Sequence, residues 1–104
     1  MDIVGVSHIK DAKKEHVVIR ARSLYIYKLM DTKPLHQSYT VVKPYAQYDD
    51  GEYAEFSVDV EPNNEFYGRI LQMGAGLEIV SPKSVHDEMA QRVQELVTLY
   101  PKNE

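Results

Sequence analysis

One stretch near the middle of this 104-residue chain alternates strictly between apolar and polar side chains. In residues 54–61 every second position is Ala, Phe or Val, and polar side chains lie between them. Because successive side chains of a strand point to opposite faces, this pattern predicts a strand with one buried face. The carboxylates Glu55, Asp59 and Glu61 are then expected on the solvated face. Asp49-Asp50-Gly51 directly precedes the strand, and because Asp-Gly suits the positive φ of a tight turn, we predict an antiparallel hairpin.

The segments before this hairpin predict a strand, a helix and a second strand. Residues 16–22 are rich in β-branched side chains, which favour a strand. Ser23 is a suitable N-cap for a helix that continues to about Lys33, where Pro34 ends it. An extended pattern resumes at residue 40 and continues to residue 48. The packed side of the predicted helix consists of Leu24, Tyr27, Leu29 and Met30.

The segments after the hairpin predict a helix, a short strand and a final helix. An Asn at 63 or 64 can cap the first of these helices, whose apolar residues are Phe66, Ile70, Leu71 and Met73, and Gly74 or Gly76 supplies its left-handed end. Residues 77–80 form a short strand. Ser81 is then expected to cap the last helix, with Pro82 in its first position. The apolar side of this last helix consists of Val85, Met89, Val93, Leu96 and Tyr100.

The resulting order is β-α-β-β-α-β followed by one more helix. This order predicts an α+β domain of the ferredoxin-like type, an antiparallel sheet with two helices on one face and an added C-terminal helix. Burial of the five apolar residues of the last helix does not offset the conformational entropy lost on ordering it. We therefore expect this helix to pack on the sheet or on a partner.

Composition and charge exclude several classes of protein. The chain contains no cysteine, which excludes disulfides and thiolate metal sites. Its apolar runs are too short for a membrane span, and its first residues lack the pattern of a signal peptide, so we expect a cytoplasmic protein. The net charge is −4, which argues against direct binding of duplex DNA. The charge is uneven, because residues 1–48 contain eight Lys and Arg against four Asp and Glu, whereas residues 49–104 contain four against twelve.

No motif in the sequence indicates an enzyme. The four histidines show no spacing typical of metal ligands, and Gly74-Ala75-Gly76 after a helix is typical of a helix end rather than of a phosphate-binding loop. The serines are explained as caps or turn residues. We therefore predict no catalytic residue, no metal site and no cofactor.

Tyrosines gather in the basic half of the chain and leave an alternative open. Exposed aromatic rings beside cations on such a sheet can stack the bases of single-stranded nucleic acid. The aromatic spacing of the segment Gly51–Phe56 is similar to that of an RNA-recognition strand. However, Glu52 and Glu55 lie where that motif has basic or neutral residues. The alternative function is therefore a free-standing module that binds a small anionic ligand or single-stranded nucleic acid. The other interpretation is that these tyrosines pack at strand edges or in an interface.

The sequence as a whole resembles the C-terminal extension (WCX) region of WYL-domain bacterial transcriptional regulators. The order and spacing of four short stretches carry the resemblance. In this family the connection after the first helix often reads Pro-Leu-His-x-Ser-Gln, and here Tyr39 replaces the last Gln. The four stretches are residues 17–20, residues 33–38, residues 61–66 leading into 70–74, and residues 77–82 followed by Met89 and Leu99-Tyr100.

The resemblance implies a domain arrangement and a role. Residues 1–14 correspond to a lead-in at the end of a preceding WYL domain, and residues 15–104 to the ferredoxin-like extension. Such a domain contributes to dimer contacts and couples an effector, often a nucleotide or nucleic acid, to DNA binding by an N-terminal helix-turn-helix domain. The implied partners are a second copy of the chain and the WYL and helix-turn-helix domains of the parent protein.

Four polar residues are the predicted site. We expect Arg20, Arg22, His36 and Gln37 to face a ligand or the neighbouring domain. Arg20 and Arg22 lie in the basic half, and His36 and Gln37 lie in the polar connection between the first helix and the second strand. The alternative for this connection is a turn in which Ser and His bind local backbone groups.

Overall fold

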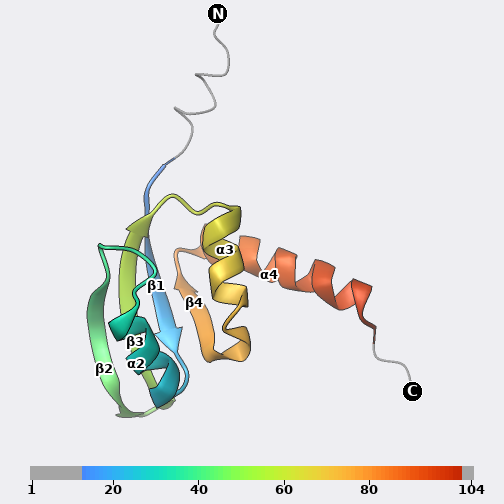
Figure 1. Cartoon of the computed structure of the whole chain (residues 1–104). Helices are drawn as coiled ribbons and strands as arrows, with labels where there is room; N and C mark the ends of the chain where they lie inside the picture. The colour runs from blue at the N-terminus through green and yellow to red at the C-terminus, as the bar shows by residue number, and fades with distance from the viewer. Residues whose placement is uncertain (1–12, 102–104) are drawn as a thin grey trace, which may run out of the picture.

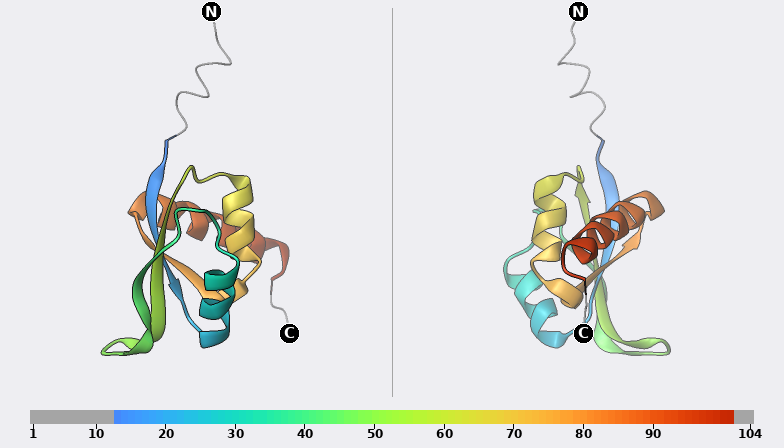
Figure 2. Two further views of the ribbon diagram at one scale, coloured as in Figure 1. Left: turned by 60° about the vertical axis from the view of Figure 1, so that its left-hand side comes forward. Right: turned by 90° about the vertical axis from the view of Figure 1, so that its right-hand side faces the viewer.

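The computed structural model describes residues 13–101 and contains an α+β fold in that range. Four antiparallel strands form a single sheet in the order β2-β3-β1-β4. Helices α2 and α3 cover one face of the sheet, and α4 leaves the β4 edge and extends beyond it (Figures 1 and 2). The elements are β1 Glu15–Ala21, α2 Leu24–Thr32, β2 Thr40–Tyr48, β3 Gly51–Val60, α3 Asn64–Leu71, a short 3-10 turn Gly74–Gly76, β4 Leu77–Ser81 and α4 Lys83–Leu99.

The predicted hairpin is confirmed. Strands β2 and β3 pair with Tyr48 opposite Gly51, and Gly51 adopts a φ of 139°. This conformation is open to glycine at little cost because glycine has no Cβ. The two-residue turn therefore fixes the register in which the rest of β3 pairs with its neighbours.

Two of the three predicted helix caps are confirmed. The Oγ atom of Ser23 accepts a hydrogen bond from the backbone N–H of Ile26 at 3.1 Å, and Oδ1 of Asn63 accepts one from Phe66 at 2.9 Å. The prediction for Ser81 is wrong, because Ser81 is the last residue of β4 and Pro82 occupies the N-cap position without a side-chain hydrogen bond. Pairing of Ser81 with Val18 of β1 holds it in the sheet.

The hydrophobic core lies between the sheet and the two helices α2 and α3. Every second residue of β3 from Ala54 to Val60 is buried there, as the alternation predicts. Met30 is the buried residue of α2, whereas Leu24, which we expected on the packed side, is exposed at the start of the helix. The buried apolar residues from the other elements include Val17, Ile19, Phe66, Tyr67, Ile70, Leu77, Ile79 and Val85.

Candidate functional site

The face of the sheet opposite α2 and α3 carries a cluster centred on Arg20. In the register of β1 and β3, Arg20 lies opposite Glu55. Its Nε and Nη2 atoms donate hydrogen bonds to Oε2 of Glu55 at 3.0 and 2.7 Å. The guanidinium also lies over the ring of Tyr53, 4.1 Å from its centroid. One cation thus contacts both a carboxylate and an aromatic face, which holds it in a fixed position.

This cluster corrects the prediction that Glu55 faces solvent. Glu55 retains only 7% of its exposed area, and Ser57 on the same side of β3 is also buried. Strand β3 is therefore covered on both faces, because Arg20 from β1 lies over its outer face. Burial acts to lower the pKa of Arg20, but the hydrogen bond and the charge of Glu55 outweigh that effect and raise it.

Tyr53 extends the cluster toward the hairpin. Its hydroxyl donates a hydrogen bond to Oδ1 of Asp50 at 2.7 Å. This hydrogen bond lowers the pKa of Asp50 and raises the pKa of Tyr53. The Nζ atom of Lys43 lies 5.1 Å from the ring centroid of Tyr48 and 5.6 Å from that of Tyr53. A layer of cations and rings therefore covers the hairpin end of the outer face.

Arg22 is the most accessible cation of this layer. Its Nη1 atom lies 3.3 Å from Oε1 of Glu78, and the two side chains retain 42% and 51% of their exposure. An exposed pair at this distance contributes little to stability. In the part of the chain that the structure describes, no ion pair includes Lys43. Arg22 and Lys43 are thus the cations that a ligand can reach with the least rearrangement.

His36 lies in a different region, and the structure does not bring the four predicted site residues together. Nδ1 of His36 lies 2.8 Å from Oγ of Ser38, and that Oγ accepts a hydrogen bond from the backbone N–H of Asp59 at 2.7 Å. Asp59 pairs with His16 at the start of β1, whereas Arg20 lies near the end of the same strand. Gln37 is exposed in the loop beside His36.

The region around His36 forms its own hollow, with a volume of about 400 Å³. The contacts of His36 are those of a turn in which Ser and His bind local groups, the alternative considered above for this connection. The hollow contains charges of both signs, and within it Nη1 of Arg69 donates a hydrogen bond to the backbone carbonyl of Leu35 at 3.3 Å. Its lining includes Lys14, His36, Asp59, Glu61, Glu65 and Arg69.

Among residues 13–101, no three His, Asp or Glu side chains lie close enough together to hold a metal ion. No helix in the same range is both long enough and apolar enough to cross a membrane.

Comparison with protein families decides where the chain belongs. The model of the WCX domain family matches residues 13–97, which is most of the chain and nearly all of the part described. The chain belongs to the WCX domain family. The resemblance predicted from the sequence is thereby confirmed. No curated protein matches the chain.

Proposed function

We propose that this WCX domain is the regulatory and dimerisation module of a WYL-type helix-turn-helix transcriptional regulator, and that it couples an effector to DNA binding without being an enzyme. The match of residues 13–97 to the WCX family is the observation that carries the proposal. The cationic layer on the outer face of the sheet supports a role in contacting an anionic effector or an acidic surface of the neighbouring domain.

We also infer that the domain has the ferredoxin-like arrangement. Read from the β4 edge, the strand order is β4-β1-β3-β2, and each of the two β-α-β units has one strand of the other unit between its own strands. Two such split units with helices on one face are the pattern of that fold. Helix α4 is then the addition.

The effector-facing role is assigned to Arg22 rather than to all four predicted residues. Arg20 is held by the buried Glu55 and by Tyr53, so its replacement would damage the fold. Arg22 pairs with an exposed carboxylate, Glu78, and lies 5.9 Å from the centroid of the Tyr53 ring, and a phosphate can replace that carboxylate with little loss of stability. A nucleotide or single-stranded nucleic acid supplies such a phosphate.

The alternative function, a free-standing module that stacks single-stranded bases, needs exposed aromatic faces. Tyr53 retains 1% of its exposure and is covered by Arg20. The ring of Tyr45 lies 6.3 Å from that of Tyr27 in a stacked arrangement. These rings are occupied within the chain, and the strongly exposed Tyr25 lies on α2 and not on the outer face of the sheet, which supports the regulatory module.

The first test measures the size of the native protein. An antibody raised to this chain is used to probe an extract of the cells that produce it. A band well above the mass of 104 residues supports the proposal, and its upstream sequence should contain a helix-turn-helix domain. A band at the mass of the chain itself contradicts the proposal and favours the free-standing module.

The second test reverses one charge in that larger regulator. Operator binding is measured by gel shift with and without a single-stranded oligonucleotide or ATP, for the wild type and for Arg22→Glu. We expect Arg22→Glu to weaken the response to the effector while circular dichroism stays unchanged. Lys28→Glu, which reverses an exposed charge on α2, is the matched control and should respond like the wild type. An unchanged response in Arg22→Glu would exclude this role for the outer face.

A further inference from the structure

Helix α4 reaches beyond the domain that it belongs to. Val85 in its first turn is buried in the core, and Met89 packs against the core one turn later. Beyond these residues the apolar side chains Val93, Leu96 and Val97 are exposed. Figure 1 shows this second half of α4 extending away from the sheet. The apolar pattern that begins in the core therefore continues into a segment that the described residues 13–101 leave exposed.

Val93, Leu96 and Val97 form one continuous stripe with Met89 and Ala90. At about 100° per residue, the stripe lies within about 60° on either side of Val93. The acidic residues of α4, Asp87, Glu88 and Glu95, lie on the other sides of the helix by the same geometry. We call this surface the α4 stripe, and it consists of Met89, Ala90, Val93, Leu96 and Val97.

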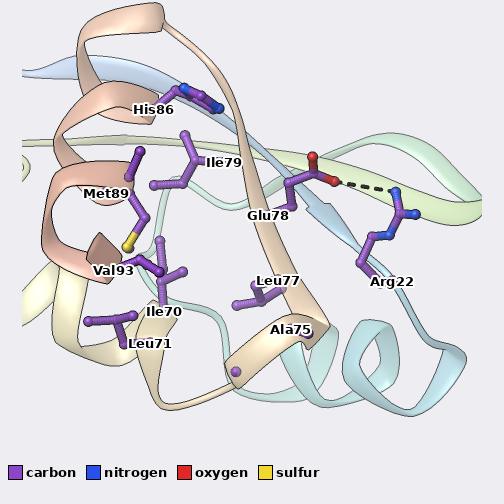
Figure 3. A pocket seen from close by; sticks show the side chains of 12 residues that line it. Arg22, Ile70, Leu71, Ala75, Leu77, Glu78, Ile79, His86, Met89 and Val93 are labelled. Carbon is purple, nitrogen blue, oxygen red and sulfur yellow. Dashed lines mark hydrogen bonds and ion pairs between the residues drawn. The ribbon is translucent and has the colours of Figure 1, made fainter. Parts of the chain in front are cut away.

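The first half of the α4 stripe forms one wall of a groove. Met89, Ala90 and Val93 face residues of α3 and β4, including Ile70 and Ile79, across a hollow of about 390 Å³. Figure 3 shows Met89 and Val93 pointing toward these residues. The same helix therefore carries an open apolar groove and, directly beyond it, an apolar segment without a groove of its own.

The exposed second half of α4 in one copy fits the groove beside the first half of α4 in another copy. If an antiparallel copy of α4 crosses with a twofold axis at Val93, the equivalent of Leu96 meets Ala90 and the equivalent of Val97 meets Met89. The overhanging segment of each copy then enters the groove of the other. Such a surface is self-complementary, which is what a twofold interface requires. We propose that the α4 stripe is the interface between two copies of this chain, paired antiparallel about Val93.

The helix dipole of α4 also supports a second copy of the chain as the partner of this surface. The last turn of α4 contains no basic residue, so the negative end of its helix dipole has no basic side chain from its own last turn. In the antiparallel pair this end lies beside the first turns of the partner's α4, which form the positive end of that helix dipole. A second copy thus places the positive end of its own helix dipole beside the negative end of this one. The inference rests on the dimerisation part of the proposed function and assigns it a surface.

The first experiment compares two substitutions near the end of α4. Val97 lies in the α4 stripe, whereas Leu99 lies about 120° away from Val93 and is even more exposed, at 69% against 52%. We expect the wild-type chain to sediment as a dimer at micromolar concentration. Val97→Asp should weaken the dimer at least about tenfold, because it buries a charge in both copies. Leu99→Asp is the matched control and should remain dimeric, and circular dichroism should show both variants folded.

The second experiment places a single thiol at the proposed axis. Because the chain has no cysteine, Val93→Cys introduces the only thiol, and the two copies of that thiol should lie close enough for a disulfide. Mild oxidation should then convert most of the protein to a linked dimer on a non-reducing gel. Gln91→Cys is exposed on the opposite side of α4 and should stay monomeric on the same gel.

Three results would overturn the inference. They are a monomeric wild type, a dimer that Val97→Asp and Leu99→Asp affect equally, and equal linkage of the two cysteine variants. None of these results depends on an effector or on DNA. A chain that pairs through α4 but belongs to no regulator would contradict the proposed function and leave the interface in place.

Discussion

The pair of Arg20 and Glu55 is the feature whose removal should change the stability of this domain most clearly. Both residues lie in the middle of the outer face, and their side chains retain only 20% and 9% of their exposure. Replacement of Arg20 by Met keeps a long apolar side chain over Tyr53 but removes both hydrogen bonds to Glu55. The carboxylate is then buried without a partner.

The expected loss in the free energy of unfolding depends on which charged group each variant leaves unpaired. Removal of one partner of a buried ion pair costs about 3–5 kcal/mol, and we expect about 3 kcal/mol for Arg20→Met because Arg20 is partly exposed. Glu55→Leu leaves a cation that can reach water, so we expect about 1.5 kcal/mol. The double variant leaves no unpaired charge and loses mainly the cation–π contact, so we expect only about 2 kcal/mol. The coupling energy between the two positions is then about 2–3 kcal/mol.

Urea denaturation followed by circular dichroism measures these differences. The pair of Arg22 and Glu78 is the matched control, because it joins the end of β1 to β4 on the same face but is exposed. Its coupling energy should not exceed about 1 kcal/mol. Additive effects of Arg20→Met and Glu55→Leu would refute the reasoning, since they would mean that neither charge depends on the other. Equal coupling in both pairs would show that burial does not decide the energy.

Three further predictions concern single positions. Ser23→Ala removes the cap of α2 and should lower the free energy of unfolding by about 1 kcal/mol in urea. Gly76→Ala places a Cβ 2.8 Å from Cγ1 of Ile26 and should lower the melting temperature, at a cost of about 1–3 kcal/mol, whereas pairing it with Ile26→Ala should recover part of that loss. Because the hydroxyl of Tyr53 lowers the pKa of Asp50, the stability from this contact is present above the ordinary pKa of Asp and is lost as pH falls through the lowered value. Tyr53→Phe should therefore raise the pKa of Asp50 in an NMR titration, and an unchanged pKa would contradict this cause.

Local signals in the sequence predicted most of the elements. The alternation in β3, the Asp-Gly turn before it and the caps at Ser23 and Asn63 each act over a few residues, and the structure confirms all four. Such signals are readable because the hydrogen bonds and the side-chain periodicity that they reflect lie within one element. The family was also readable, because the order of short motifs is preserved along the chain.

The candidate site was predicted only in part. Arg20 and Arg22 do lie together on the outer face, but His36 and Gln37 belong to a loop near the other end of β1. The sequence placed all four in one site because it contains no information on which end of the sheet each segment reaches. That information depends on the register of strands that are distant along the chain.

Glu55 and α4 show the same division between sequence and tertiary structure. The sequence determined that Glu55 lies on the face of β3 opposite the core, and that α4 is an apolar-sided helix. Only the tertiary structure decided that Arg20, 35 residues away, covers Glu55, and that the second half of the apolar side of α4 is exposed among the residues described. The physical reason is that periodicity fixes the direction of a side chain relative to its own backbone. What meets that side chain is set by packing between elements that no local pattern relates.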